Sequence, residues 1–147
     1  MGKGIIYPSI EKIIGFNVLA LSLLKAKKAD KAQVLSTSKL RVALDECKNT
    51  DEDVHGKAAA LLKGIVQKHP FASGNRRTAF IAAKHFALSN GGRFNIEDNP
   101  SHANAMKGVR EGYYTDDEIK EWIMHGKIRE FERRANPKDS GAGNPKI

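Results

Sequence analysis

Hydrophobic positions recur along this chain every three or four residues, with polar residues between them, which is the spacing of helices buried on one face. The first such segment follows Pro8 and Ser9 and predicts a helix over residues 9–28. Its most apolar part, residues 13–24, is interrupted by polar residues and too short to cross a bilayer, so we interpret it as a buried helix.

The same spacing returns often enough to predict an all-α protein, with about six helices in a compact bundle. Five such segments follow the first. The expected helices are a segment capped by Ser38 with Leu40, Ala43, Leu44 and Cys47; residues 53–68, 78–90 and 100–111; and a last segment with Ile119, Trp122, Ile123 and Ile128.

Punctuating residues set the ends of these helices. Pro70 stops the third, because proline disfavours helical geometry in the residue before it. Asn99 is expected to cap the fifth helix, with Pro100 at its first position. The sequence TDDE at 115–118 is a capping box. The apolar pattern ends near residue 133, so we expect one domain over residues 1–132 and a polar, flexible tail over 133–147.

Composition narrows the possible partners. The 25 Lys and Arg residues exceed the 17 Asp and Glu residues, and the net charge of +8 suits an anionic partner such as nucleotide, nucleic acid, phosphoprotein or acidic protein. The single cysteine, Cys47, cannot form an internal disulfide, and the absence of a signal-peptide pattern agrees with a cytoplasmic protein without membrane attachment. Basic residues are spread along the chain rather than gathered on one helix, which argues against nucleic acid.

The chemistry concentrates in HPFASGNRRTAF, residues 69–80. Gly74 and Asn75 are turn formers, and Arg76 and Arg77 follow where a helical pattern begins. The start of a helix carries unpaired N–H groups and roughly half a positive charge, so two arginines there have the unfavourable sign. A bound phosphate would remove the conflict, because helix N-termini and guanidinium groups both bind phosphate.

His69 stands at the mouth of the same loop. A neutral imidazole there could accept a proton from a hydroxyl group that attacks phosphorus. The C-terminal end of its own helix favours imidazolium, whereas the nearby guanidinium groups favour the neutral ring, so the sequence leaves its protonation state open.

The stretch HPFASGNRRTA, preceded by LLKGIVQK and followed by AFIAAKHFALSNG, resembles the Fic/Doc family, whose core motif reads His-Pro-Phe-x-acidic-Gly-Asn-Gly/Lys-Arg. LSTSKLRVALDEC and GVREGYYTDDEIKEWI are similar to segments of the death-on-curing (Doc) branch. The resemblance covers most of the chain up to about residue 133.

This resemblance implies a Fic fold that binds ATP with Mg²⁺ and modifies a hydroxyl group of a target protein. It makes His69 the general base and Phe71 a buried anchor of the loop. Gly74 and Asn75 would shape a phosphate nest, with Asn75 also able to bind the metal, and Arg77 would hold the nucleotide phosphates. The connector over residues 32–37 lies where Fic proteins carry a short target-docking flap, although a plain linker fits it nearly as well.

Departures from the motif bear on the reaction. Arg76 stands where adenylyl-transferring members have glycine and Doc has lysine, and Phe80 stands where adenylyl transferases have a second arginine. Both features of the adenylyl transferases are therefore absent. The long cation at position 76, with RTA following, resembles Doc, which transfers the terminal phosphoryl group to a Thr of elongation factor Tu. Ser73 replaces the acidic magnesium ligand, which weakens the metal site while leaving a hydroxyl that can ligate magnesium.

The resemblance therefore implies a Doc-like toxin that phosphorylates a Ser or Thr of a translation factor. The autoinhibitory Ser/Thr-x-x-x-Glu-Gly/Asn motif is absent from the sequence, which implies control by a separate antitoxin. The alternatives are protein adenylyl transfer and a Fic-fold binding protein whose catalysis is weakened by Ser73.

Overall fold

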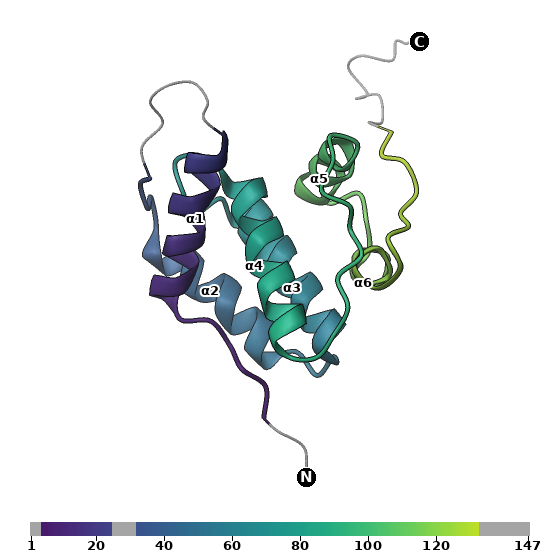
Figure 1. Ribbon diagram of the computed structural model, residues 1–147, viewed down its shortest axis with the longest axis horizontal. Helices are drawn as coiled ribbons and strands as arrows, with labels where there is room; N and C mark the ends of the chain where they lie inside the picture. The colour runs from purple at the N-terminus through teal and green to yellow at the C-terminus, as the bar shows by residue number, and fades with distance from the viewer. Residues whose placement is uncertain (1–3, 25–31, 133–147) are drawn as a thin grey trace.

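The computed structural model describes residues 4–24 and 32–132. These residues form six helices and no strand, which confirms the all-α prediction (Figure 1). The helices are α1 (Ile10–Leu24), α2 (Thr37–Asn49), α3 (Val54–Lys68), α4 (Asn75–Ser89), α5 (His102–Arg110) and α6 (Asp116–His125). The expected end of the first helix at residue 28 and the expected tail over 133–147 lie outside the described residues.

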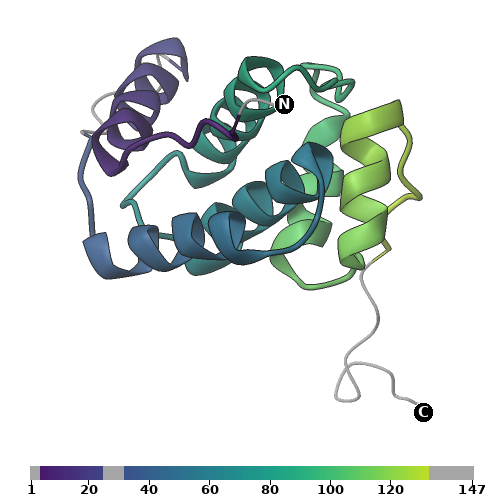
Figure 2. The same cartoon turned by 90° about the horizontal axis from the view of Figure 1, so that it is seen from below.

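Helix α3 is the centre of the bundle. It packs against α2, α4, α5 and α6, while α1 packs mainly against α4 and lies on the opposite side of α3 and α4 from α6 (Figures 1 and 2). Small residues permit this crowding: a Cβ added to Gly64 would stand 2.9 Å from the Cβ of Ala43 on α2. Because α3 is covered on several sides, its final residue is held in a defined place, and the loop that follows it starts from there.

Cys47 belongs to this core. Its side chain is fully buried, and burial raises the pKa of the thiol to about 11, so it is not a thiolate nucleophile at neutral pH. Beside it the Lys57 ammonium donates to the carbonyl oxygens of Lys48 and Thr50 at the end of α2. A cation at this end of a helix is favourable because the last carbonyl groups have no partner within the helix.

Three of the helix starts agree with the sequence pattern. Ser9 Oγ accepts a hydrogen bond from Lys12 N–H, as expected for the residue that caps α1. Asp53 caps α3, and the capping box of Thr115 and Glu118 is present at α6. These devices act within one turn of chain, which is why the sequence alone predicts them.

The predicted cap of α2 is wrong by two residues. Ser36, and not Ser38, accepts from Lys39 N–H, at 3.1 Å. The reason is tertiary: Leu35 and Ser36 both donate their backbone N–H to the carbonyl oxygen of Pro70, at 2.8 and 3.2 Å, so the chain is held extended up to Ser36 and turns into the helix directly afterwards.

Two further boundaries also differ. Helix α4 begins at Asn75 rather than residue 78, because Gly74 takes a left-handed conformation and the helix follows at once. Helix α5 begins at His102 rather than residue 100, because Asn99 Oδ1 accepts from Ser101 N–H in a turn before the helix.

The last helix is shorter than expected. It ends at Gly126, which has a positive φ of 74°, so Ile128 lies outside α6. Ile128 still packs, partly buried, against the core. Among the described helices, none combines the length and apolar character needed to cross a membrane.

Candidate functional site

The loop between α3 and α4 is built around the buried ring of Phe71, whose exposure is 0%. The Asn75 side chain clamps it: Oδ1 accepts from the Phe71 N–H at 3.0 Å and Nδ2 donates to the Phe71 carbonyl oxygen at 2.8 Å. Asn75 is itself buried. Both ends of its amide are therefore engaged in closing the loop, which gives the loop one shape.

His69 ends α3 and starts this loop. Among the described residues other than glycine, it alone has a positive φ, 54°, a conformation that side chains with a Cβ rarely adopt. Its backbone N–H donates to the carbonyl oxygen of Ile65, which completes the last turn of α3. The left-handed turn reverses the chain at His69 and leaves the residue exposed.

The surroundings of His69 favour one answer to the protonation question that the sequence left open. Partial desolvation of the ring, followed by the charges of Arg110, Lys39 and Arg76, lowers the pKa of His69 below its ordinary value. Desolvation and the neighbouring positive charges both favour the neutral imidazole, which is the form that can accept a proton.

An extended segment runs beside the loop. Val34 and Phe71 form an isolated antiparallel bridge, in which Ala72 N–H donates to the Gln33 carbonyl oxygen at 2.9 Å. Leu35, next along this segment, is 57% exposed. The connector expected over residues 32–37 is thus bound to the backbone beside His69 and presents an apolar side chain there.

Helix α1 supports the far end of the loop through Asn17, a residue that sequence analysis did not assign to the site. Asn17 is buried, and its Nδ2 donates to the carbonyl oxygen of Ser73 at 2.9 Å and to Thr78 Oγ1 at 3.1 Å. Because C=O and N–H point in opposite directions in a trans peptide, this bond turns the N–H of Gly74 away from α1. The sequence signal was an asparagine within the most apolar part of this segment, residues 13–24.

The loop forms one wall of a cavity of about 420 Å³. Six of the residues singled out from the sequence meet there, while Phe71 lies buried beneath the loop. The cavity is lined by Val66, His69, Ala72, Ser73, Gly74, Asn75, Arg76, Arg77 and Arg110.

Arg110, at the end of α5, is the second residue of this site that sequence analysis missed. It lies 33 positions after Arg77 in the chain, and nothing in its local sequence marks it. The packing of α5 against α3 brings it to the cavity. Its charge, from α5, and that of Arg76, from α4, both lower the pKa of His69.

Arg77 is held by a carboxylate. Its Nη1 and Nη2 atoms bind the two oxygens of Asp98 at 2.6 and 2.9 Å, and its guanidinium lies 5.1 Å from the centre of the Phe80 ring. The pair lowers the pKa of Asp98 and raises that of Arg77. Phe80 is buried, so its ring supports Arg77 instead of facing a ligand.

The side chains of the cavity do not suit a protein-held Mg²⁺. A hard divalent cation requires oxygen ligands, usually carboxylates. The lining residues include no carboxylate, and the Asn75 amide is bonded to Phe71. Within residues 4–24 and 32–132, no group of three or more His, Cys, Asp or Glu is arranged to hold a metal. The arginines that surround the cavity would repel a cation.

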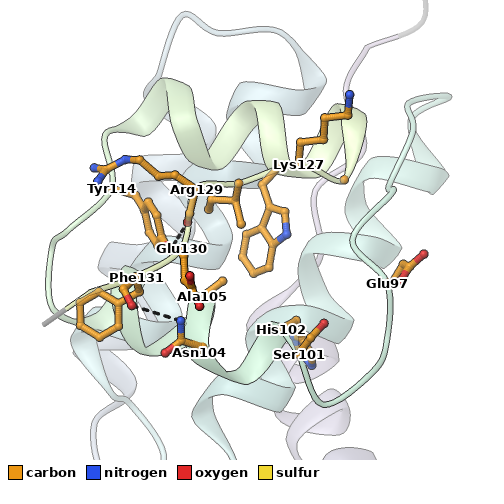
Figure 3. Close-up of a pocket in the computed structure, with 13 residues that line it drawn as sticks. Glu97, Ser101, His102, Asn104, Ala105, Tyr114, Lys127, Arg129, Glu130 and Phe131 are labelled. Atoms are coloured by element: carbon orange, nitrogen blue, oxygen red, sulfur yellow. Dashed lines mark hydrogen bonds between the residues drawn. The ribbon is translucent and has the colours of Figure 1, made fainter.

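A larger cavity of about 680 Å³ lies away from His69, between α5, α6 and the segment after α6 (Figure 3). Hydrogen bonds join the segment after α6 to α5 and to the connection between α5 and α6: the Tyr114 hydroxyl donates to the Arg129 carbonyl oxygen at 2.8 Å, and Asn104 Nδ2 donates to that of Phe131 at 3.3 Å. Its charged lining mixes both signs, with Glu97 and Glu130 beside Lys127 and Arg129. It has the character of a seam where residues 127–131 pack against α5 and α6, and we do not assign it chemistry.

Comparison with known proteins finds a match to a segment that includes the loop of the smaller cavity. The family model described as Fic/DOC family matches residues 24–87, which include the extended segment, α2, α3, the His69 loop and most of α4. No curated protein matches the chain. The match covers less than half of the chain, and the all-helical fold of the described residues is consistent with the Fic fold.

Proposed function

We propose that this protein transfers a phosphoryl group from ATP to a Ser or Thr hydroxyl of a protein target in the cytoplasm, such as a translation elongation factor, as a Doc-like toxin. The observation that carries the proposal is the position of His69. Its neutral imidazole faces a cavity lined by Arg76, Arg77 and Arg110, beside an extended segment able to receive a peptide.

In the proposed reaction each residue has a separate task. The arginines hold the phosphates, since guanidinium groups form forked, charge-assisted hydrogen bonds with them. The His69 ring accepts the proton of the target hydroxyl as its oxygen attacks the terminal phosphorus, and the bond from that phosphorus to the bridging oxygen breaks, releasing ADP. Phe71 and Asn75 keep the loop in shape.

The residue at position 76 favours phosphoryl over adenylyl transfer. Arg76 is exposed and lines the cavity, so its long side chain occupies space that a glycine would leave for a phosphate close to the backbone. Adenylyl transfer is the alternative reaction. Because the sequence carries no inhibitory motif of the Fic type, we propose that a separate antitoxin controls the protein.

Transfer from two labelled forms of ATP tests the reaction. The protein is incubated in cell extract with γ-labelled or α-labelled ATP, beside a His69→Ala variant. We expect protein to be labelled from the γ position only and only by the wild type. Labelling from the α position alone would replace kinase with adenylyl transferase, and equal labelling by wild type and variant would contradict catalysis by His69.

A binding protein without activity is the second candidate, favoured by Ser73 at the acidic position and by the carboxylate of Asp98 on Arg77. It predicts that ATP stabilises the fold in a thermal shift assay without any transfer of label. Stabilisation by duplex DNA and not by ATP would instead indicate a nucleic-acid partner.

Releasing Arg77 from its carboxylate is expected to strengthen nucleotide binding. Asp98→Asn removes a charge that competes with phosphate, so the dissociation constant for ATP should fall several-fold. The unfolding free energy should fall by no more than about 1 kcal/mol, because the pair is partly exposed. Calorimetry and urea unfolding measure the two effects.

Glu97→Gln is the matched control, since it removes the same charge one position away. It should leave the affinity for ATP nearly unchanged. Weaker binding by Asp98→Asn would show that Asp98 is needed to orient Arg77.

The dependence of transfer on pH should follow the ring of His69. Its pKa is lowered, so the neutral ring persists below the ordinary histidine range, and the rate should fall only when the pH drops through that lowered value. Lys39 contributes to the lowering from α2 but does not line the cavity. Lys39→Gln should therefore move this fall in rate, the acid limb of the pH profile, to higher pH without changing the contacts with phosphate.

Lys84→Gln serves as the control for net charge, because Lys84 does not contribute to the shift at His69. Rate profiles of wild type and both variants between acid and neutral pH measure the effect. An acid limb that moves equally in both variants would show that the limb does not report His69.

A further inference from the structure

The cavity beside His69 is lined by positive charge from two helices, α4 and α5. Arg76 and Arg77 stand in the first turn of α4, and Arg110 stands at the end of α5. Helix α4 begins without a side chain bonded to its first N–H groups, which adds the positive end of its dipole. The neutral polar side chains of the lining belong to Ser73 and Asn75.

Two of these arginines are not neutralised within the described part of the chain. Arg77 is paired with Asp98, whereas neither Arg76 nor Arg110 forms an ion pair with any carboxylate of the described residues. Other cations of the fold do have such partners, among them Lys63 with Asp116. The cavity therefore carries positive charge that an anion would compensate.

Arg110 is placed to contact the same ligand in the cavity as Arg76. Both line the cavity, and both lower the pKa of His69, which requires their charges to lie near the same ring. Arg110 is exposed, so its side chain can turn toward a ligand without leaving a core position. An anion at His69 would thus be bracketed by guanidinium groups from α4 and α5.

From this charge and from the lack of carboxylates, we propose that Arg110 is a phosphate-binding residue and that fixed arginine charges replace a protein-held divalent cation, so that polyphosphate binds in the cavity without Mg²⁺. The identity of the ligand as a nucleotide rests on the proposed function. A cation ligated by the protein strengthens the binding of phosphates. Fixed guanidinium groups do the opposite in the presence of Mg²⁺, because the metal reduces the negative charge of ATP.

Calorimetric titration with ATP, in EDTA and then in excess Mg²⁺, tests whether binding is independent of the metal. Wild-type protein should bind ATP in EDTA at least as tightly as with Mg²⁺. Tightening by tenfold or more on adding Mg²⁺ would overturn the inference and leave the proposed function standing. Failure to bind ATP under either condition would overturn both.

Substitutions at Arg110, measured in EDTA, test whether this residue binds phosphate. Arg110→Gln should weaken ATP binding by about tenfold or more, as expected for a lost bond between charged groups, and Arg110→Lys should fall between it and wild type. Arg93→Gln is the matched control: it removes the same charge from an exposed residue that does not line the cavity, and should change affinity less than about twofold, by screening. Equal effects of the Gln variants would show that Arg110 contributes only net charge.

Discussion

Replacing His69 with glycine is expected to lower the rate of transfer by about 10²–10⁴-fold, the usual contribution of a general base, while leaving the protein folded. Glycine is the informative substitution because His69 has a positive φ of 54°. A left-handed conformation costs a residue with a Cβ about 1–2 kcal/mol, which glycine avoids at some cost in chain entropy. The unfolding free energy should therefore be unchanged or higher by about 1 kcal/mol.

His69→Ala completes the design, since alanine removes the imidazole but keeps the strained backbone. Both variants should lose transfer to the same extent, and the glycine variant should be the more stable of the two by urea unfolding. If activity instead followed stability across wild type and both variants, His69 would act through the fold and the general-base assignment would be wrong.

Phe71→Ala is expected to cost about 3–5 kcal/mol of unfolding free energy, the range for removing a fully buried aromatic ring. The ring is 0% exposed, and the backbone of the same residue bonds to Asn75 and bridges to Val34. The cavity left by the ring lies under the His69 loop. Loss of ATP binding should therefore accompany the loss of stability, as measured by urea unfolding and calorimetry.

The neighbouring Leu35→Ala gives the comparison. Leu35 lies on the extended segment but is 57% exposed, so its truncation should change stability by no more than about 0.5 kcal/mol. A cost at Phe71 similar to that at Leu35 would contradict the assignment of Phe71 as the anchor of the loop.

The helical architecture was predictable because it depends on residues close together in the chain. Apolar spacing places the helices, and the capping box of Thr115 and Glu118 acts within one turn. Errors arose where a distant segment intervened. The sequence offers both Ser36 and Ser38 as caps for α2, and only the bonds of Leu35 and Ser36 to the Pro70 carbonyl group select Ser36.

The candidate site shows the same division. His69, Ser73, Gly74, Asn75, Arg76 and Arg77 follow one another closely and line one cavity. Asn17 and Arg110 come from α1 and α5, and Asp98 binds Arg77 across 21 positions of chain. Arg110 and Asp98 stand in ordinary local sequences. Asn17 is conspicuous in an apolar segment, but nothing in its window indicates a partner 56 positions away.

By itself, then, the sequence determined that the chain is helical and singled out residues 69–77 as the candidate site, because periodicity and turn residues act locally. Only the tertiary structure decided the lowered pKa of His69, the pairing of Arg77 with Asp98 and the position of Arg110 at the cavity. These depend on electrostatic interactions and burial between side chains that packing brings together from separate helices, and such interactions depend on distance in space rather than along the chain.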